Sequence, residues 1–199
     1  CTGACEAGYD GSNTGSTSSK CAGKCPEGRY CVAGEMPRNC GALSKYCPEG
    51  SGSPLTVAPK HYSTGIRCLT GLLRQNCQTG QKLCEDGHHC DEGVMTACVA
   101  GEYCKGGDRT SCTLATQFCP ALSSSPTAVS RGWYSRPAGS NSPRTSQVKC
   151  EAGYQCANGV KTVCGSNAKF ASEGQELCST VQVGWYSTPE GSLGETPTG

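Results

Sequence analysis

Cysteine is the residue through which this sequence can do chemistry. The chain has 19 cysteines among 199 residues, near one residue in ten. Paired thiols form disulfides, clustered thiolates bind zinc, and a lone thiolate beside a suitable base is a nucleophile. Disulfides persist in oxidising compartments, so this composition predicts a disulfide-rich protein that is extracellular or at the cell surface.

Zinc is the alternative interpretation of some of these cysteines. Cys1-x3-Cys5 and Cys21-x3-Cys25 are separated by fifteen residues, a spacing within the range of four-cysteine zinc sites. His88-His89-Cys90 offers further ligand atoms, but we interpret it as an exposed polar turn. We favour disulfides and expect neither a metal nor another cofactor. Because 19 is odd, at least one cysteine is unpaired within this sequence, and we expect it to bond outside the sequence rather than to be a catalytic thiol.

The rest of the composition excludes several function classes. Leu, Val, Ile and Phe together number 23, about an eighth of the chain, which is too few for an ordinary apolar core. Without such a core there is no large apolar pocket, and no nucleotide-binding or paired-carboxylate motif is present, so we expect no enzyme. The 17 basic and 16 acidic residues nearly balance, so nucleic acid is not implied. No apolar run is long enough for a membrane span.

One cysteine spacing, C-x5-C-x7/8-C-x6-C, recurs along the chain. It fits two complete copies and one incomplete copy: Cys25, Cys31, Cys40 and Cys47; Cys98, Cys104, Cys112 and Cys119; and Cys150, Cys156 and Cys164, where Ala171 takes the fourth position and Cys178 follows. Glycines stand three residues after the first cysteine (Gly8, Gly28, Gly87, Gly101, Gly153) and after the second (Gly34, Gly93, Gly107, Gly159). This fixed offset predicts tight turns with positive φ.

Aromatic residues repeat in the same register. Fifteen residues after the fourth cysteine position come Tyr62, Tyr134 and Tyr186, each followed by serine, and the last two are preceded by Trp133 and Trp185. We interpret these five side chains as packing at the junctions between modules, because a chain with few apolar residues uses its aromatics there. A flat surface that stacks on a sugar or another ligand is the alternative.

The repeat organises the chain into modules. We predict a small disulfide-rich fold, an elongated tandem array of short β-hairpin modules with almost no helix, since no segment has a helical apolar period. The expected parts are a partial N-terminal module (1–24), repeat one (25–65), a cysteine-rich insert (66–97), repeat two (98–137), a Ser/Pro/Gly linker (138–149), repeat three (150–191) and a polar tail (192–199).

The segment CPEGRYCVAGEMPRNCGALSKYCPEGSGSPLTVAPKHYSTG resembles the ephrin-receptor-like cysteine-rich repeats of large surface proteins in unicellular eukaryotes, notably algae and water moulds. Similar growth-factor-like repeats occur in shaft proteins of flagellar hairs and other surface fibres. The resemblance implies interleaved disulfides: Cys25–Cys40 with Cys31–Cys47, and Cys98–Cys112 with Cys104–Cys119. In repeat three it implies Cys156–Cys178, with Cys150 and Cys164 as the other bonded cysteines.

Glycosylation at hydroxyl groups is a second expectation. No Asn-x-Ser/Thr sequon is present, so we predict no N-glycans. Ser- and Thr-rich stretches next to proline can carry O-glycans or be bare polar loops. The candidate residues are Ser53, Ser125, Thr127, Ser142, Thr188 and Thr196.

These observations favour a structural protein. A covalently cross-linked repeat array resists proteases and mechanical load better than a small core does, so we expect a subunit of a fibre, flagellar hair or surface coat. A receptor or adhesin ectodomain that binds a protein or glycan is the alternative, and a secreted inhibitor is a third. The sequence, which opens on Cys1, is expected to be a mature segment or a piece of a longer chain. Cys5-Glu6-Ala7-Gly8-Tyr9 resembles the module start at Cys150, which predicts head-to-tail filaments in which residues 1–24 of one copy pack on residues 180–199 of the preceding copy.

Overall fold

The computed structural model describes residues 5–12, 17–70, 73–139, 141–165, 168–188 and 193–195, and the side chains of these residues except 66–76 and 193–195. The described residues form strands, turns and bends, and no helix occurs among them. Accordingly, this part of the chain contains no helix with the length and apolar character that a membrane span requires. The predicted disulfide-rich array of short hairpins is confirmed.

The chain divides into two units, Cys1–Thr96 with Gly106–Asp108, and Ala97–Lys105 with Arg109–Gly199. Every strand pairs with its neighbour in sequence to form a two-stranded sheet. The first eight strands are β1 (Arg29–Tyr30), β2 (Arg38–Asn39), β3 (Lys45–Tyr46), β4 (Leu55–Thr56), β5 (His61–Thr70), β6 (Leu73–Leu83), β7 (His88–Asp91) and β8 (Val94–Ala97).

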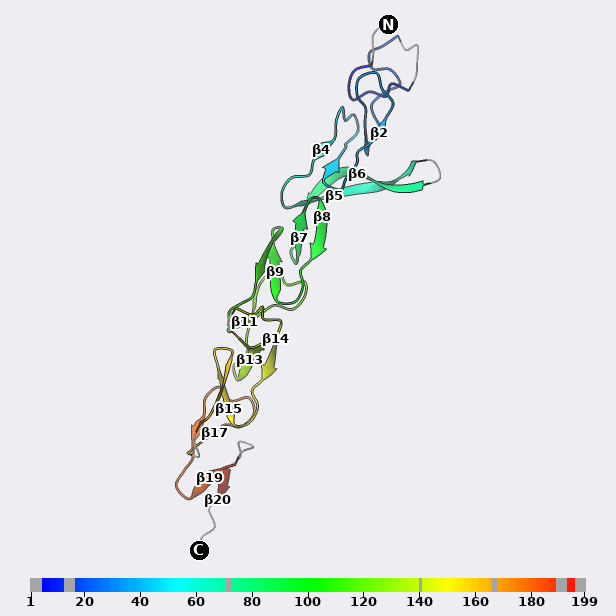
Figure 1. The fold of residues 1–199 in the computed structure, drawn as a ribbon. Helices are drawn as coiled ribbons and strands as arrows, with labels where there is room; N and C mark the ends of the chain where they lie inside the picture. The colour runs from blue at the N-terminus through cyan, green and yellow to red at the C-terminus, as the bar shows by residue number, and fades with distance from the viewer. Residues whose placement is uncertain are drawn as a thin grey trace. The chain divides into compact units, whose positions relative to one another are not determined.

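The remaining twelve strands are β9 (Glu102–Lys105), β10 (Asp108–Ser111), β11 (Gln117–Phe118), β12 (Thr127–Ala128), β13 (Trp133–Arg136), β14 (Ser146–Lys149), β15 (Tyr154–Ala157), β16 (Val160–Val163), β17 (Lys169–Phe170), β18 (Ser179–Thr180), β19 (Trp185–Ser187) and β20 (Leu193–Glu195). Within the second unit the hairpins follow one another in chain order from β11 to β19 (Figure 1).

Glycines set the turns, as the fixed offsets predict. All nine glycines of the two offset series have positive φ, between 73° and 93°. Three of the hairpins turn through two consecutive residues of positive φ, the geometry of a type I′ turn that matches strand twist. These pairs are Glu92-Gly93, Gly106-Gly107 and Asn158-Gly159.

Two expected boundaries do not coincide with the strands. Strand β5 runs across the expected boundary between residues 65 and 66, and β6 returns beside it to complete one long hairpin (Figure 1). The expected linker 138–149 contains β14, which pairs with β13 from Trp133↔Lys149 to Arg136↔Ser146. The Ser- and Pro-rich composition of this segment is not typical of a strand. The strand forms because its backbone pairs with β13 and because Val148 packs on Tyr134 and Cys150.

The disulfide pairing implied by the resemblance is wrong. The bonds join the first cysteine to the second and the third to the fourth: Cys25–Cys31, Cys40–Cys47, Cys98–Cys104, Cys112–Cys119 and Cys150–Cys156. Cys178 bonds Cys164 rather than Cys156. Cys5–Cys21 and Cys84–Cys90 bring to eight the disulfides whose two side chains both lie in the described part of the chain, and Cys77 is also disulfide-bonded.

Local turns explain this pairing. After Cys25, the amide of Arg29 donates to the carbonyl of Pro26 at 3.2 Å, and the turn returns Cys31 to within 5.7 Å of Cys25, Cα to Cα. Each disulfide therefore closes a loop around its own turn. Backbone hydrogen bonds join the two halves of a module, since Gly28 donates to Cys47 at 2.7 Å and accepts from Cys40 at 3.3 Å. Interleaved disulfides are not needed to hold the halves together.

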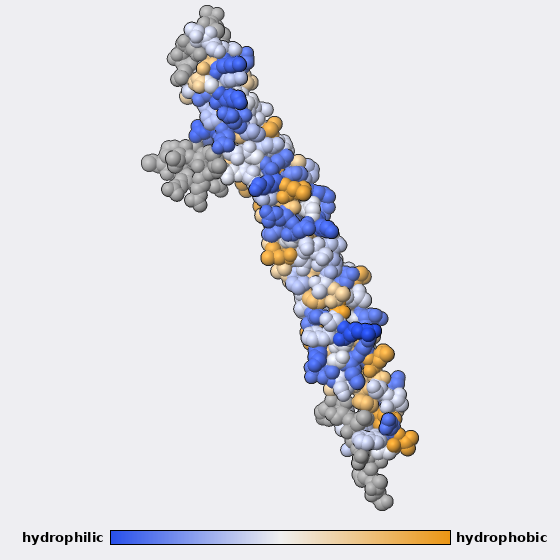
Figure 2. All heavy atoms as spheres, turned by 180° about the vertical axis from the view of Figure 1, so that it is seen from behind, coloured by the Kyte–Doolittle hydropathy of each residue, from blue (hydrophilic) through white to orange (hydrophobic). Residues whose placement is uncertain are grey.

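Cysteines also form most of the interior. Apart from them, the buried apolar side chains in the described part of the chain are Val57, Tyr134 and Ala171. Ala171 is fully buried at the fourth cysteine position and accepts a hydrogen bond from Gly153 at 2.8 Å, so the backbone keeps the module pattern after the cysteine has moved. Apolar side chains on the face in Figure 2 form small separated patches.

Candidate functional site: the joints between modules

Consecutive modules meet through one recurring backbone contact, which we call the glycine joint. At each joint a glycine three residues after the second cysteine of a module lies beside an earlier strand in a parallel bridge. The three pairs are Tyr62↔Gly93, His89↔Gly107 and Tyr134↔Gly159. The amide of the residue after the bridge partner donates to the glycine carbonyl, at 2.8 Å from Ser63, 3.3 Å from Cys90 and 3.1 Å from Ser135. The joint is therefore made by backbone atoms and repeats along the chain.

These joints leave no room for a side chain. A Cβ on Gly159 would lie 1.8 Å from the carbonyl oxygen of Ala115, and one on Gly93 would lie 2.0 Å from that of Leu43. A Cβ on Gly107 would lie 2.7 Å from the Cβ of Lys60. Glycine is required at the joints both for its positive φ and for this close approach.

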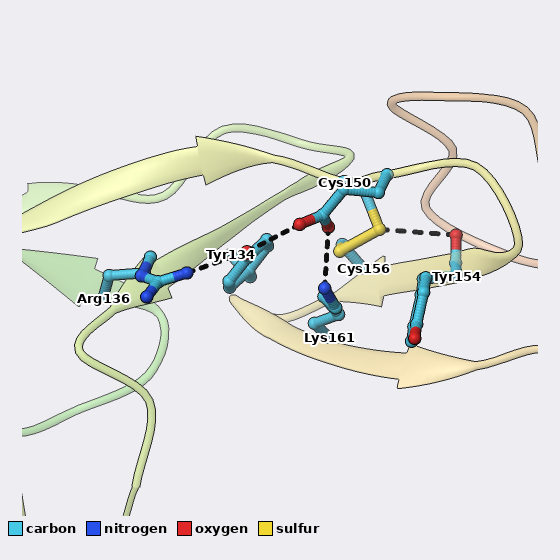
Figure 3. Close-up of polar contacts among 7 residues, drawn as sticks. Tyr134, Arg136, Cys150, Tyr154, Cys156 and Lys161 are labelled. Carbon is cyan, nitrogen blue, oxygen red and sulfur yellow. Dashed lines mark hydrogen bonds and ion pairs between the residues drawn. A yellow bond between two sulfur atoms is a disulfide. The ribbon is translucent and has the colours of Figure 1, made fainter.

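At two of the joints the residue that bridges to the glycine is a tyrosine, Tyr62 or Tyr134. Tyr134 is only 4% exposed and packs with Cys150, Cys156, Val148 and Tyr154. Its hydroxyl donates to Glu151 at 3.1 Å and accepts from Arg136 at 3.4 Å (Figure 3). Tyr62 makes the equivalent bond to Glu85 at 3.5 Å. The tyrosine thus connects the end of one module to the start of the next.

Lys161 completes the polar network at the second of these joints. Its Nζ lies 3.0 Å from Glu151 Oε2, 4.2 Å from the centroid of the Tyr154 ring and 5.2 Å from that of Tyr134 (Figure 3). Its hydrogen bond lowers the pKa of the Glu151 carboxyl, partly opposed by desolvation and aided by the backbone amide and the Tyr134 hydroxyl. The same hydrogen bond raises the pKa of Lys161. Both charges are favoured by their mutual contact.

The five aromatics predicted at junctions differ in exposure. Tyr134 is buried, whereas Tyr62 and Trp133 are half-buried. Trp185 and Tyr186 occupy the same register on β19 but are 39% and 49% exposed, and Val183 beside them is fully exposed. The structure therefore buries one of these aromatics at a joint and leaves an equivalent pair accessible.

The described cysteines of the zinc-like spacing are bonded in disulfides. The sulfurs of Cys5, Cys21 and Cys25 belong to disulfides, and Cys1 lies outside the described residues. Cys90 is likewise bonded to Cys84, so the His88-His89-Cys90 run has no thiolate to offer. Among the candidate O-glycosylation residues, Ser53, Ser125 and Thr127 are exposed, Ser142 and Thr188 are half-buried, and Thr196 is outside the described residues.

Two grooves occupy equivalent places beside the glycine joints. One, of about 540 Å³, is lined by Val57, Lys60 and Gly93, and the other, of about 370 Å³, by Val129, Arg131 and Gly159. Each groove lies within one unit and follows from the same backbone arrangement. Sequence reasoning missed these grooves and the parallel bridges, although the recurring glycines marked their positions.

Comparison with protein-family models and with curated proteins finds no match for this chain.

Proposed function

We propose that this chain is a structural subunit of an extracellular fibre, flagellar hair or cell-surface coat, and that it has no catalytic role. The observation that carries the proposal is the glycine joint, which occurs three times in the described part of the chain with the same backbone bridge and hydrogen bond. A contact made by backbone atoms joins modules of different side-chain sequence in the same way. That property suits an array whose task is to extend.

The disulfides support the same proposal. Their number is typical of extracellular or secreted proteins, where thiols are oxidised. Each of the eight disulfides in the described part of the chain closes a local loop, with a sequence separation of 6 to 16 residues. A local disulfide cross-links its own module whatever the state of its neighbours.

Copies are proposed to join head to tail, with residues 1–24 of one chain on residues 180–199 of the preceding chain. The support is the exposure of Trp185 and Tyr186, because Tyr134 in the same register is covered by the module that follows it. Residues 1–4, 13–16, 189–192 and 196–199 of these segments lie outside the described residues. We expect association of two copies to bury part of the Trp185 and Tyr186 side chains.

Electron microscopy of the purified chain tests this proposal. Linear particles that lengthen with concentration are expected for the wild type, and Trp185→Ser with Tyr186→Ser should suppress them. Val163→Ser is the matched control, since Val163 is an exposed apolar residue of the same unit. Discrete monomers or closed dimers at all concentrations would show that the fibre proposal is wrong.

A receptor or adhesin ectodomain is the second candidate function. The two grooves beside the glycine joints favour it, because repeated concave sites are suited to a repeating protein or glycan ligand. Saturable binding of such a ligand by a monomeric chain distinguishes this function from fibre assembly. In either case the exposed hydroxyls of Ser53, Ser125 and Thr127 are proposed to carry O-glycans.

A further inference from the structure

The second unit contains a cavity that the glycine joints do not explain. It has a volume of about 320 Å³ and lies between the segment that connects β13 to β14 and the hairpin β15–β16. Its lining includes Tyr134, Arg136, Ala138, Arg144, Val160 and Lys161. This volume falls at the lower end of the range, about 300–1,000 Å³, that small-molecule sites occupy. We call it the Arg144 pocket.

Arg144 is a buried cation without a carboxylate partner. Its side chain is 6% exposed, and its Nη atoms donate to the carbonyls of Ser135 at 3.3 Å, Pro137 at 2.7 Å and Gly139 at 2.5 Å. Its Nε is buried with no hydrogen-bond partner, and no ion pair to Arg144 is found among the described residues. Removing a charge from water is costly when no opposite charge compensates it.

The other unit shows that this position does not need a charge. Cys119 donates its amide to the carbonyl of Arg144 at 2.9 Å, and Cys47 donates in the same way to Gln78, also at 2.9 Å. Gln78 is buried to the same extent as Arg144, at 6% exposed. A neutral side chain therefore fills the equivalent position in the first unit, and the cation in the second unit is an addition to the module pattern.

Two further cations border the same cavity. The guanidinium of Arg136 donates to the Tyr134 hydroxyl at 3.4 Å, which is the one hydrogen bond that its side chain makes within the described part of the chain (Figure 3). Lys161 lines the pocket and is paired with Glu151. The lining of the pocket thus includes three cations, of which Lys161 is the one with a carboxylate partner among the described residues, and the apolar side chains of Ala138 and Val160 complete it.

We propose that the Arg144 pocket binds a small organic oxyanion, the carboxylate or sulfate ester of a sugar-sized molecule. The oxyanion supplies the missing counter-charge for Arg144 and accepts hydrogen bonds from the free N–H groups of Arg136. The carbon skeleton of the ligand contacts Ala138 and Val160. A guanidinium pairs with carboxylate and sulfate oxygens in the same planar geometry, so both chemistries fit. This proposal is independent of fibre assembly.

Titration of the isotope-labelled chain by NMR tests the pocket, with glucuronate and glucose 6-sulfate as probes and methyl glucoside as the neutral control. The wild type should bind at least one anionic probe saturably, with shifts at Ala138, Val160 and Lys161, and salt should weaken the binding. Binding of one probe or of both identifies the oxyanion. Arg136→Gln and Arg144→Gln should each weaken it by about tenfold or more.

Arg131→Gln is the matched control, because Arg131 is an exposed arginine of the same unit that pairs with Glu176 at 3.3 Å and does not line this pocket. It should leave the affinity unchanged. Arg144→Gln installs the residue that the first unit carries at this position, and the exposed Arg136 provides a second variant if the first disturbs the loop. The proposal is wrong if neither anionic probe saturates the wild type, or if Arg136→Gln and Arg131→Gln bind equally well.

Discussion

The hydroxyl of Tyr134 and the carboxylate of Glu151 form a hydrogen bond of 3.1 Å that connects the hairpin closing one module to the turn opening the next. The pair Tyr62 and Glu85 repeats this contact in the other unit at 3.5 Å. Tyr134 and Glu151 are 17 positions apart in the sequence, and Tyr62 and Glu85 are 23 apart. The second separation is larger because the β5–β6 hairpin is longer than β13–β14. The contact depends on the hairpin register at its base and not on the length of the hairpin.

Tyr134→Phe should destabilise the second unit by about 0.5–1.5 kcal/mol, because it removes this hydrogen bond and keeps the ring. Tyr154→Phe is the control, since the Tyr154 hydroxyl makes no hydrogen bond among the described residues while its ring also lies beneath Lys161. Urea unfolding followed by tryptophan fluorescence measures both. Equal stability of wild type and Tyr134→Phe contradicts a contribution from this bond.

Gly159→Ala should destabilise the second unit more than Gly165→Ala does. The two glycines have similar φ, 73° and 70°, so both variants incur the left-handed backbone strain of about 1–2 kcal/mol. A Cβ on Gly165 meets its nearest atom at 3.8 Å, whereas one on Gly159 would overlap the Ala115 carbonyl. We expect an additional loss of about 1 kcal/mol or more for Gly159→Ala in thermal unfolding. Equal losses would mean that the joint tolerates a side chain.

Acid should weaken the contact between Glu151 and Lys161. Because the folded-state pKa of Glu151 is lowered, its contribution to stability is complete above the ordinary glutamate pKa and is lost as the pH falls through the folded value. Because the folded-state pKa of Lys161 is raised, the contribution of Lys161 to stability is lost at the alkaline end, as the pH rises through the folded-state pKa.

Unfolding midpoints at a series of pH values test this dependence. In Glu151→Gln the unfolding midpoint should fall less at acid pH than it does in the wild type; we call this fall the acid limb. Glu173→Gln, which removes an exposed glutamate paired with Lys149 at 3.2 Å, should retain that limb. An unchanged acid limb in Glu151→Gln would assign the dependence to other carboxylates.

Replacing both Cys164 and Cys178 with serine should destabilise repeat three by about 3 kcal/mol, the value expected for a loop of this length. Because the eight disulfides in the described part of the chain all close local loops, hydrogen exchange in residues 25–65 should be unchanged. A metal chelator under oxidising conditions should leave both regions folded. Unfolding by the chelator alone contradicts the disulfide assignment.

The turns and hairpins could be predicted from the sequence because a glycine at a fixed offset indicates a turn with positive φ. All nine of those glycines adopt the expected positive φ. The disulfide pairing was predicted wrongly because it was taken from a resemblance. Cys84 and Cys90 carried the contrary signal, since they form a half-module with only the first two cysteine positions and bond each other.

The joints and the Arg144 pocket could not be predicted in the same way. The bridge between Tyr134 and Gly159 is made by backbone atoms, which leave little trace in residue type apart from the glycine itself. The strand 146–149 is polar and lies in a Ser- and Pro-rich segment, so its pairing with β13 has no alternating apolar pattern. Burial of Arg144 depends on three carbonyls of a connecting segment, and sequence gives no measure of that geometry.

The half-module that opens at Cys84 ends where Cys98 opens the next module, and its strand β7 provides His89 as bridge partner for Gly107. The half-module therefore takes part in two glycine joints: Gly93 bridges to Tyr62 before it, and His89 bridges to Gly107 after it. The backbone contact of the joint therefore does not depend on whether the segment that supplies the glycine has two cysteines or four, since Gly93 belongs to a half-module and Gly107 to a complete repeat.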